Sequence, residues 1–135
     1  MLAAMVLGAE GVQIGTLFAL STESSASDAF KTRCTALEEG DTMLTLKLIS
    51  PTRLVKNALY SRIMQAEKEG AAVEDLRQIL GKAASKRGIF EGDIENGELE
   101  IGQIASAVRE VLPVCEIMER LKQEYSSARA RLLSL

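Results

Sequence analysis

The chain has 135 residues, of which 47% are hydrophobic and 26% are charged, and its net charge is -3. This composition supports a globular core and argues against a disordered chain. The lack of a basic excess gives no reason to expect a nucleic acid or an anionic membrane surface as a partner. No apolar run approaches the length of a membrane span, so we expect a cytoplasmic protein.

Cysteine and histidine usage restricts the chemistry further. Cys34 and Cys115 lie far apart without metal-ligand spacing, as is typical of a reduced intracellular protein. We therefore expect both thiols to be free and Cys34 to have a packing role. Histidine is absent altogether, which removes the commonest general base at neutral pH and the commonest metal ligand.

The first forty residues combine two helices with a short strand. Residues 1–7 are apolar nearly all round, like the end of a buried helix, and Gly8 is suited to end it. Gly11 to Ile14 reads as a short buried strand. The hydroxyl residues that follow offer N-caps for a helix over Ser27 to Glu38.

The middle of the chain alternates extended and helical patterns. From Asp41 to Ile49 the apolar residues recur with a period of two, which predicts an extended segment that Pro51 ends. Helical spacing then predicts helices over Thr52 to Glu69 and over Val73 to Leu80. The glycine-rich, acidic stretch from Gly88 to Ala105 favours a loop or a tight extended hairpin.

The end of the chain is helical. A helical segment is predicted over Ile104 to Val111, and Pro113 is suited to begin the last helix. Its apolar side chains form one stripe: Val114, Ile117, Met118, Leu121, Tyr125, Ala128 and Leu132. This inventory is unusual, because the single central-type strand over Gly11 to Ile14 needs sheet partners that the rest of the chain barely offers.

The segment GAEGVQIGT, residues 8–16, contains the first candidate ligand site. Gly15 lets a ligand approach the main chain closely, and Thr16 adds a hydroxyl beside exposed backbone N–H groups. Such a corner, placed at the carboxyl end of a strand, suits a phosphate. The alternative is that these glycines mark a plain turn.

The chain resembles the carboxyl-terminal part of the nitronate monooxygenase (2-nitropropane dioxygenase) family. The resemblance covers essentially the whole sequence and rests on five segments in the same order, namely GAEGVQIGTLF, DTMLT, PTRLVKN, FEGDIENGELEIGQIA and the closing amphipathic helix. It implies an α/β fold in which this chain is a fragment of an FMN-binding TIM (β/α)8 barrel, with the last strand and helix and a mostly helical subdomain. The implied parts are residues 1–40 for the end of the barrel, residues 41–112 for the helical subdomain and residues 113–135 for the C-terminal amphipathic helix.

The same resemblance implies a cofactor site. It assigns Gln13, Ile14, Gly15 and Thr16 to the phosphate of FMN. A second glycine-rich turn that completes the cradle in the family has no counterpart in this chain. Leu17 stands where family members often carry arginine, so the corner lacks a cation that would strengthen phosphate binding.

Gly102 and Gln103 match a family segment that returns toward the substrate side of the flavin. The resemblance implies that Gln103 forms a hydrogen bond with the substrate or the flavin, and the alternative is a capping and packing role at a helix start. The catalytic base of the family is a histidine placed upstream, so no catalytic residue is carried over to this chain.

Two charged clusters have less specific patterns. Lys82, Lys86 and Arg87 would suit an acidic carrier protein or a pyrophosphate, although a solvated loop face is the preferred interpretation. The five acidic residues between Glu91 and Glu100 lack the order of a calcium-binding loop, so we predict no metal site there.

Two classes of function follow from the sequence. The first is an FMN-dependent oxidoreductase with a small-molecule substrate, which either oxidises alkyl nitronates with dioxygen or acts as a flavin-dependent enoyl-ACP reductase. The second is a non-catalytic helical remnant that self-associates or binds a complementing barrel fragment. The open strand edge and the apolar first helix suggest this second function, because they would expose surface that is prone to association.

Overall fold

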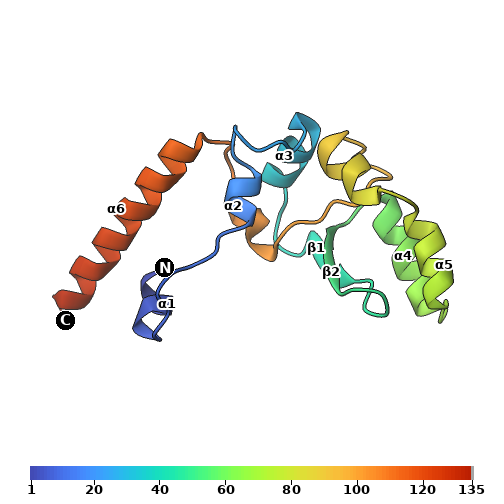
Figure 1. Cartoon of the computed structure of the whole chain (residues 1–135), viewed down its shortest axis with the longest axis horizontal. Coiled ribbons are helices and arrows are strands. Elements are labelled where there is room, and N and C mark those ends of the chain that lie inside the picture. Colours follow the sequence, from blue (N-terminus) through green and yellow to red (C-terminus); the bar gives the residue numbers. More distant parts are fainter. Residues whose placement is uncertain (135) are drawn as a thin grey trace. The chain divides into compact units, whose positions relative to one another are not determined.

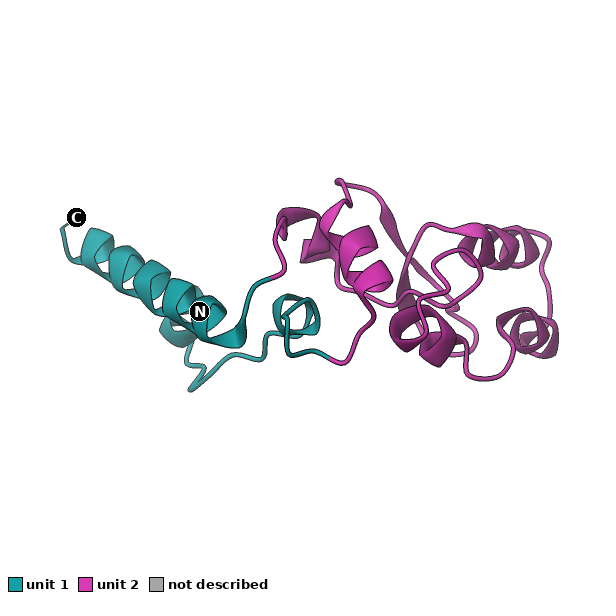
Figure 2. Ribbon diagram, turned by 90° about the horizontal axis from the view of Figure 1, so that it is seen from above, with its two compact units in different colours: residues 1–24, 112–135 teal, residues 25–111 magenta. Residues whose placement is uncertain are grey.

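The computed structural model describes residues 1–134 and divides into two compact units, drawn in different colours in Figure 2. Unit 1 combines residues 1–24 with the residues from Leu112 onward, and unit 2 comprises residues 25–111. The fold is mostly helical with one small antiparallel sheet. Among the described residues, no helix is long and apolar enough to cross a membrane. The division into residues 1–40, 41–112 and 113–135 follows the parts of the family fold and stays a prediction.

Unit 1 contains the helices α1 (Leu2–Val6), α2 (Thr16–Ala19) and α6 (Val114–Leu133), which Figure 1 labels. α1 and α6 lie where the sequence predicted helices, but α1 contains no buried residue, although residues 1–7 were predicted to be the end of a buried helix. Pro113, predicted to be the first residue of α6, is its N-cap in an extended conformation, so the helix begins one position later, at Val114. The Glu23 carboxylate accepts hydrogen bonds from the Val114 N–H at 3.0 and 3.1 Å, so it satisfies a donor at the start of this helix.

The strand predicted over Gly11 to Ile14 is wrong. Residues 11–15 have no regular secondary structure, and the sheet in the described part of the chain contains only β1 and β2 of unit 2. Val12, expected inside a buried strand, is 39% exposed. The physical reason is the missing neighbour: a strand exists by exchanging backbone hydrogen bonds with another strand, and this segment has none within reach.

Unit 2 begins with α3 (Asp28–Thr35), where the sequence predicted a helix. The Ser27 hydroxyl accepts a hydrogen bond from the Phe30 N–H at 3.2 Å and so provides the expected N-cap. The extended segment predicted over Asp41 to Ile49 is confirmed only in part, as β1 (Thr42–Thr45), because residues 47–49 form a turn. It pairs antiparallel with β2 (Thr52–Val55).

The second strand corrects the sequence analysis, which predicted a helix beginning at Thr52. The helix, α4 (Ala58–Lys68), starts six positions later because Asn57 caps it: the Asn57 side-chain oxygen accepts from the Tyr60 N–H at 2.9 Å. Pro51 does not end the extended structure, since it lies between two paired strands. The alternation before Pro51 therefore marked only the first half of a hairpin.

The helix α5 (Val73–Leu80) has the predicted bounds and packs beside α4. The two helices and the hairpin share one hydrophobic core, whose buried members are Leu46, Leu54, Leu59, Ile63, Leu76 and Ala84. Leu54 of β2 shares this core with Leu59 and Ile63 of α4. Unit 2 thus has the core expected of a compact domain.

The glycine-rich stretch is not a simple loop. It begins in a π-helical turn, η1 (Lys86–Phe90), and later places Glu100 in an isolated bridge with Leu54 of β2. The helix predicted over Ile104 to Val111 is shorter than expected and is a 3-10 helix, η2 (Gln103–Ala107). The extended character predicted for this stretch is therefore confined to the part that pairs with β2.

Candidate functional site

The candidate phosphate corner leads from an irregular segment into the short helix α2. Gly15 is the N-cap of this helix, with φ -83° and ψ -63°, which any residue adopts. The backbone does not need glycine at this position. A Cβ atom built on Gly15 would meet no atom within 4 Å, so the missing side chain leaves open space beside the main chain.

The corner contains backbone N–H donors that have no hydrogen-bond partner in the described residues. Within residues 1–134, the backbone N–H groups of Gly15, Thr16, Leu17 and Phe18 form no hydrogen bond, as expected for the first turn of a helix. The Thr16 hydroxyl is half-buried beside them. Consecutive free N–H groups with a hydroxyl are the chemistry that binds an oxyanion. The donor set therefore fits the phosphate of FMN, although residues 8–18 include no lysine or arginine.

The predicted substrate-side residues lie in unit 2, whereas the corner belongs to unit 1. Gly102 has an extended conformation and precedes η2. The Gln103 side chain is exposed and forms no hydrogen bond with the described residues, so it does not cap the helix. It lines a shallow cavity of about 560 Å³ together with Ser106 and Arg109. Its role toward a substrate or a flavin stays a prediction.

The two thiols differ sharply in environment. Both are free, as expected, and Cys115 is exposed. Cys34 is fully buried on α3, which confirms its packing role. Burial raises the pKa of the Cys34 thiol to about 12, and the nearby Arg33 guanidinium opposes this rise only in part. Cys34 is therefore a neutral, unreactive thiol.

The charged clusters form local contacts. The Lys86 ammonium lies 3.0 Å from the Glu91 carboxylate, and the Arg87 guanidinium donates to the backbone carbonyls of Lys82 and Leu80. These contacts support the interpretation of a solvated loop face. Across the part of the chain that the structure describes, no group of three or more histidine, cysteine, aspartate or glutamate residues is arranged to hold a metal ion.

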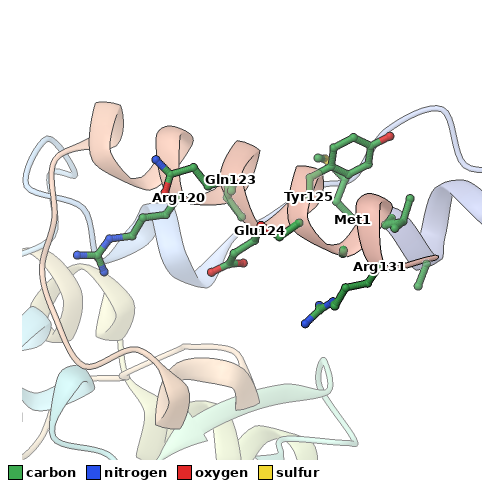
Figure 3. Close-up of a pocket in the computed structure, with 11 residues that line it drawn as sticks. Met1, Arg120, Gln123, Glu124, Tyr125 and Arg131 are labelled. Atoms are coloured by element: carbon green, nitrogen blue, oxygen red, sulfur yellow. The ribbon is translucent and has the colours of Figure 1, made fainter. Parts of the chain in front are cut away.

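A cavity within unit 1 was missed by the sequence analysis. It has a volume of about 720 Å³ and lies between the start of the chain and the middle of α6 (Figure 3). Its wall includes apolar residues of the predicted stripe, Leu121, Tyr125 and Ala128, together with the charged side chains of Glu124 and Arg131. The apolar stripe was the one indication of this cavity in the sequence, but the contact of the stripe with residues 1–3 depends on the tertiary fold.

Comparisons with known proteins agree on one family. A family model described as nitronate monooxygenase matches residues 1–124. A probable nitronate monooxygenase of Staphylococcus saprophyticus is 31% identical over 126 residues, which cover 91% of this chain and 35% of the relative. A probable nitronate monooxygenase of Bacillus subtilis is 28% identical over 123 residues, which cover 90% of this chain and 35% of that relative.

Among solved structures, FabK from Thermotoga maritima superposes with a TM-score of 0.88 and 32% sequence identity. The match covers 98% of this chain and 42% of FabK. The chain thus spans little more than a third of the length of the curated relatives that it matches. The sequence match and the structural match together show that this chain belongs to the nitronate monooxygenase family.

Proposed function

We propose that the chain forms the carboxyl-terminal part of an FMN-dependent oxidoreductase of the TIM-barrel type, and that the corner at Gln13, Ile14, Gly15 and Thr16 holds the FMN phosphate. The observation that carries this proposal is the run of four free backbone N–H donors beside the open space at Gly15. Membership of a flavin-dependent family supports the choice of FMN among phosphate-bearing ligands.

The residues of the corner have distinct roles in this proposal. The backbone N–H groups from Gly15 to Phe18 donate to the phosphate oxygens, and the Thr16 hydroxyl adds a further donor. Because Leu17 brings no positive charge, binding depends on these neutral donors and on the partial positive charge of the helix end. When bound, FMN supplies the capacity to accept and donate electrons.

We propose oxidation of alkyl nitronates with dioxygen as the reaction of the complete enzyme, in the cytoplasm. This chain contributes no histidine that could act as the base, so its own roles are phosphate binding and, through Gln103, a hydrogen bond on the substrate side. The alternative is flavin-dependent enoyl-ACP reduction, which the structural similarity to FabK supports.

The test supplies the complete enzyme that contains this chain with FMN and measures turnover of two substrates. Dioxygen consumption with propionate 3-nitronate would support nitronate oxidation, and loss of an enoyl thioester that depends on reduced nicotinamide would support the alternative. A complete enzyme that retains FMN but turns over neither substrate would refute both activities.

A further inference from the structure

Gln103, which the proposed function assigns to the substrate side, lies at the start of a very short helix. η2 spans only five residues, and a 3-10 helix of this length contributes little stability by itself. The Gln103 side chain is exposed and forms no hydrogen bond with the described residues. The position of this side chain therefore depends on the contacts that fix its neighbours in the chain to the rest of unit 2.

Two contacts hold the beginning and the middle of this segment. The Ile101 N–H donates to the Arg53 carbonyl of β2 at 3.3 Å, and the Ile101 side chain is buried. Ala105, in the middle of η2, is fully buried, and η2 packs against α3. Neither contact lies beyond Ala105, so the end of the segment needs a separate anchor.

A single side chain provides the anchor at the end. The Arg109 guanidinium donates to the Leu37 carbonyl at 2.7 Å, across 72 positions of the chain. Leu37 is buried and lies directly after the C-cap of α3. The bond has a charged donor, and within residues 1–134 Arg109 forms no ion pair that would compete with it. Arg109 therefore joins the residues after η2 to the end of α3.

The same bond connects the two walls of the cavity of about 560 Å³ that Gln103 lines. One wall is η2, and the other is the turn at residues 38–41, which begins directly after the carbonyl that Arg109 contacts. The turn has a fixed form, since the Asp41 carboxylate accepts from the Glu38 N–H at 2.9 Å. Loss of the Arg109 bond would let η2 move relative to this turn, and Gln103 would move with it.

We propose that Arg109 is a positioning residue, which holds the Gln103 side chain in place in the cavity by tying η2 to the end of α3. This inference rests on the proposed role of Gln103 and needs no contact between Arg109 and the substrate. Position matters for the rate, because a displacement of about 1 Å in a group that orients the substrate can cost about a hundredfold.

The test is a double-mutant cycle in the complete enzyme that contains this chain, with kcat/KM as the readout. Gln103→Ala and Arg109→Met should each lower kcat/KM about tenfold. The double variant should be no worse than Gln103→Ala, because the amide that Arg109 positions is then already absent. Arg109→Lys, which keeps a charged donor for the Leu37 carbonyl, should retain most of the activity. Arg62→Met is the matched control, since this exposed arginine bonds the Asn96 side chain outside the cavity, and it should leave kcat/KM unchanged.

A second measurement does not depend on turnover. The backbone N–H groups of Ala105 and Val108 donate to the Gly102 and Ala105 carbonyls, at 3.0 and 2.9 Å. Hydrogen exchange at these two amides should become about tenfold faster in Arg109→Met and stay unchanged in the control variant. If the enzyme turned over neither substrate, faster exchange would still support the anchoring of η2 by Arg109, whereas the proposed activity would fail.

Three results would overturn the inference. Unchanged exchange in Arg109→Met would mean that η2 keeps its place without this bond, whatever the activity. Additive losses in the cycle would mean that Arg109 acts independently of Gln103. Full activity in Gln103→Ala would mean that the amide has no effect on the reaction for Arg109 to support.

Discussion

The side-chain amide of Asn57 donates a hydrogen bond to the backbone carbonyl of Gly97, at 2.9 Å and forty positions further along the chain. The same amide donates to the Ile94 carbonyl at 3.0 Å, while the Asn57 side-chain oxygen accepts from the Tyr60 N–H. One side chain therefore starts α4 and fixes the glycine-rich stretch beside it.

Replacing Asn57 with alanine should lower the free energy of unfolding by about 2 to 3 kcal/mol, because it removes a helix cap and leaves two partly buried carbonyls without a donor. Urea denaturation followed by circular dichroism measures this loss. Asn96→Ala is the control, since Asn96 is exposed and its side chain accepts only from the Arg62 guanidinium on the surface. Equal losses in both variants would contradict the role assigned to Asn57.

Gly97→Ala should be more costly, because the added methyl group would meet backbone atoms and not a movable side chain. A Cβ on Gly97 falls well inside van der Waals contact of the Gly88 Cα and N and the Asp93 carbonyl oxygen. Overpacking of this kind costs about 3 kcal/mol. The same denaturation experiment compares it with Gly11→Ala, whose Cβ would meet nothing within 4 Å. A Gly97→Ala protein as stable as the control would show that the backbone around Gly97 moves away from Gly88 at little cost in free energy.

Cys34 makes the free energy of unfolding depend on pH in the alkaline range. Its pKa is raised from 9.0 to about 12 in the folded chain, so between these values the unfolded chain loses the proton while the folded chain keeps it. The contribution of Cys34 is present in full below pH 9 and is lost as the pH rises toward 12, at about 1.4 kcal/mol per pH unit.

This slope is measured by denaturation across that pH range. Cys34→Ala should reduce the slope, whatever its effect on stability at neutral pH, whereas Cys115→Ala at the exposed thiol should leave the slope unchanged. An unaltered slope in the Cys34 variant would mean that the buried thiol ionises as readily as an exposed one.

Gly15→Val should weaken FMN binding at least tenfold without unfolding the chain. The backbone at Gly15 accepts a side chain without strain and the Cβ meets nothing, so the substitution fills only the space assigned to the phosphate. Isothermal titration with FMN measures the affinity. Gly11→Val is the matched control, because it adds the same side chain in the same segment outside the corner. Loss of affinity in both variants, or in neither, would argue that the corner is only a turn.

The sequence was sufficient for elements whose ends are determined locally. α5 has its predicted bounds, and α3 and α6 begin directly after Ser27 and Pro113, because capping chemistry acts within one turn of helix. β2 was missed because Thr52 to Val55 also fits a helical pattern. Its pairing with β1 is a tertiary contact that periodicity does not contain.

The candidate site was predictable in part for a related reason. The glycine–threonine corner was visible as a motif, and the open space beside Gly15 agrees with the close approach of a ligand that was expected there. The segment from Gly11 to Ile14 has the composition of a strand, yet a strand depends on neighbours. The chain superposes on FabK over nearly its whole length, so its backbone follows the course of a family structure although residues 11–14 form no strand.

The most direct test of the FMN site is a titration of the 135-residue chain with FMN that follows flavin fluorescence and the melting temperature together. A ligand that binds only the folded state stabilises it, by about 2.7 kcal/mol when its concentration is a hundred times Kd. We predict saturable quenching of the fluorescence with a parallel rise in Tm. Unchanged fluorescence and Tm at saturating FMN would contradict the assignment of the phosphate corner in this chain.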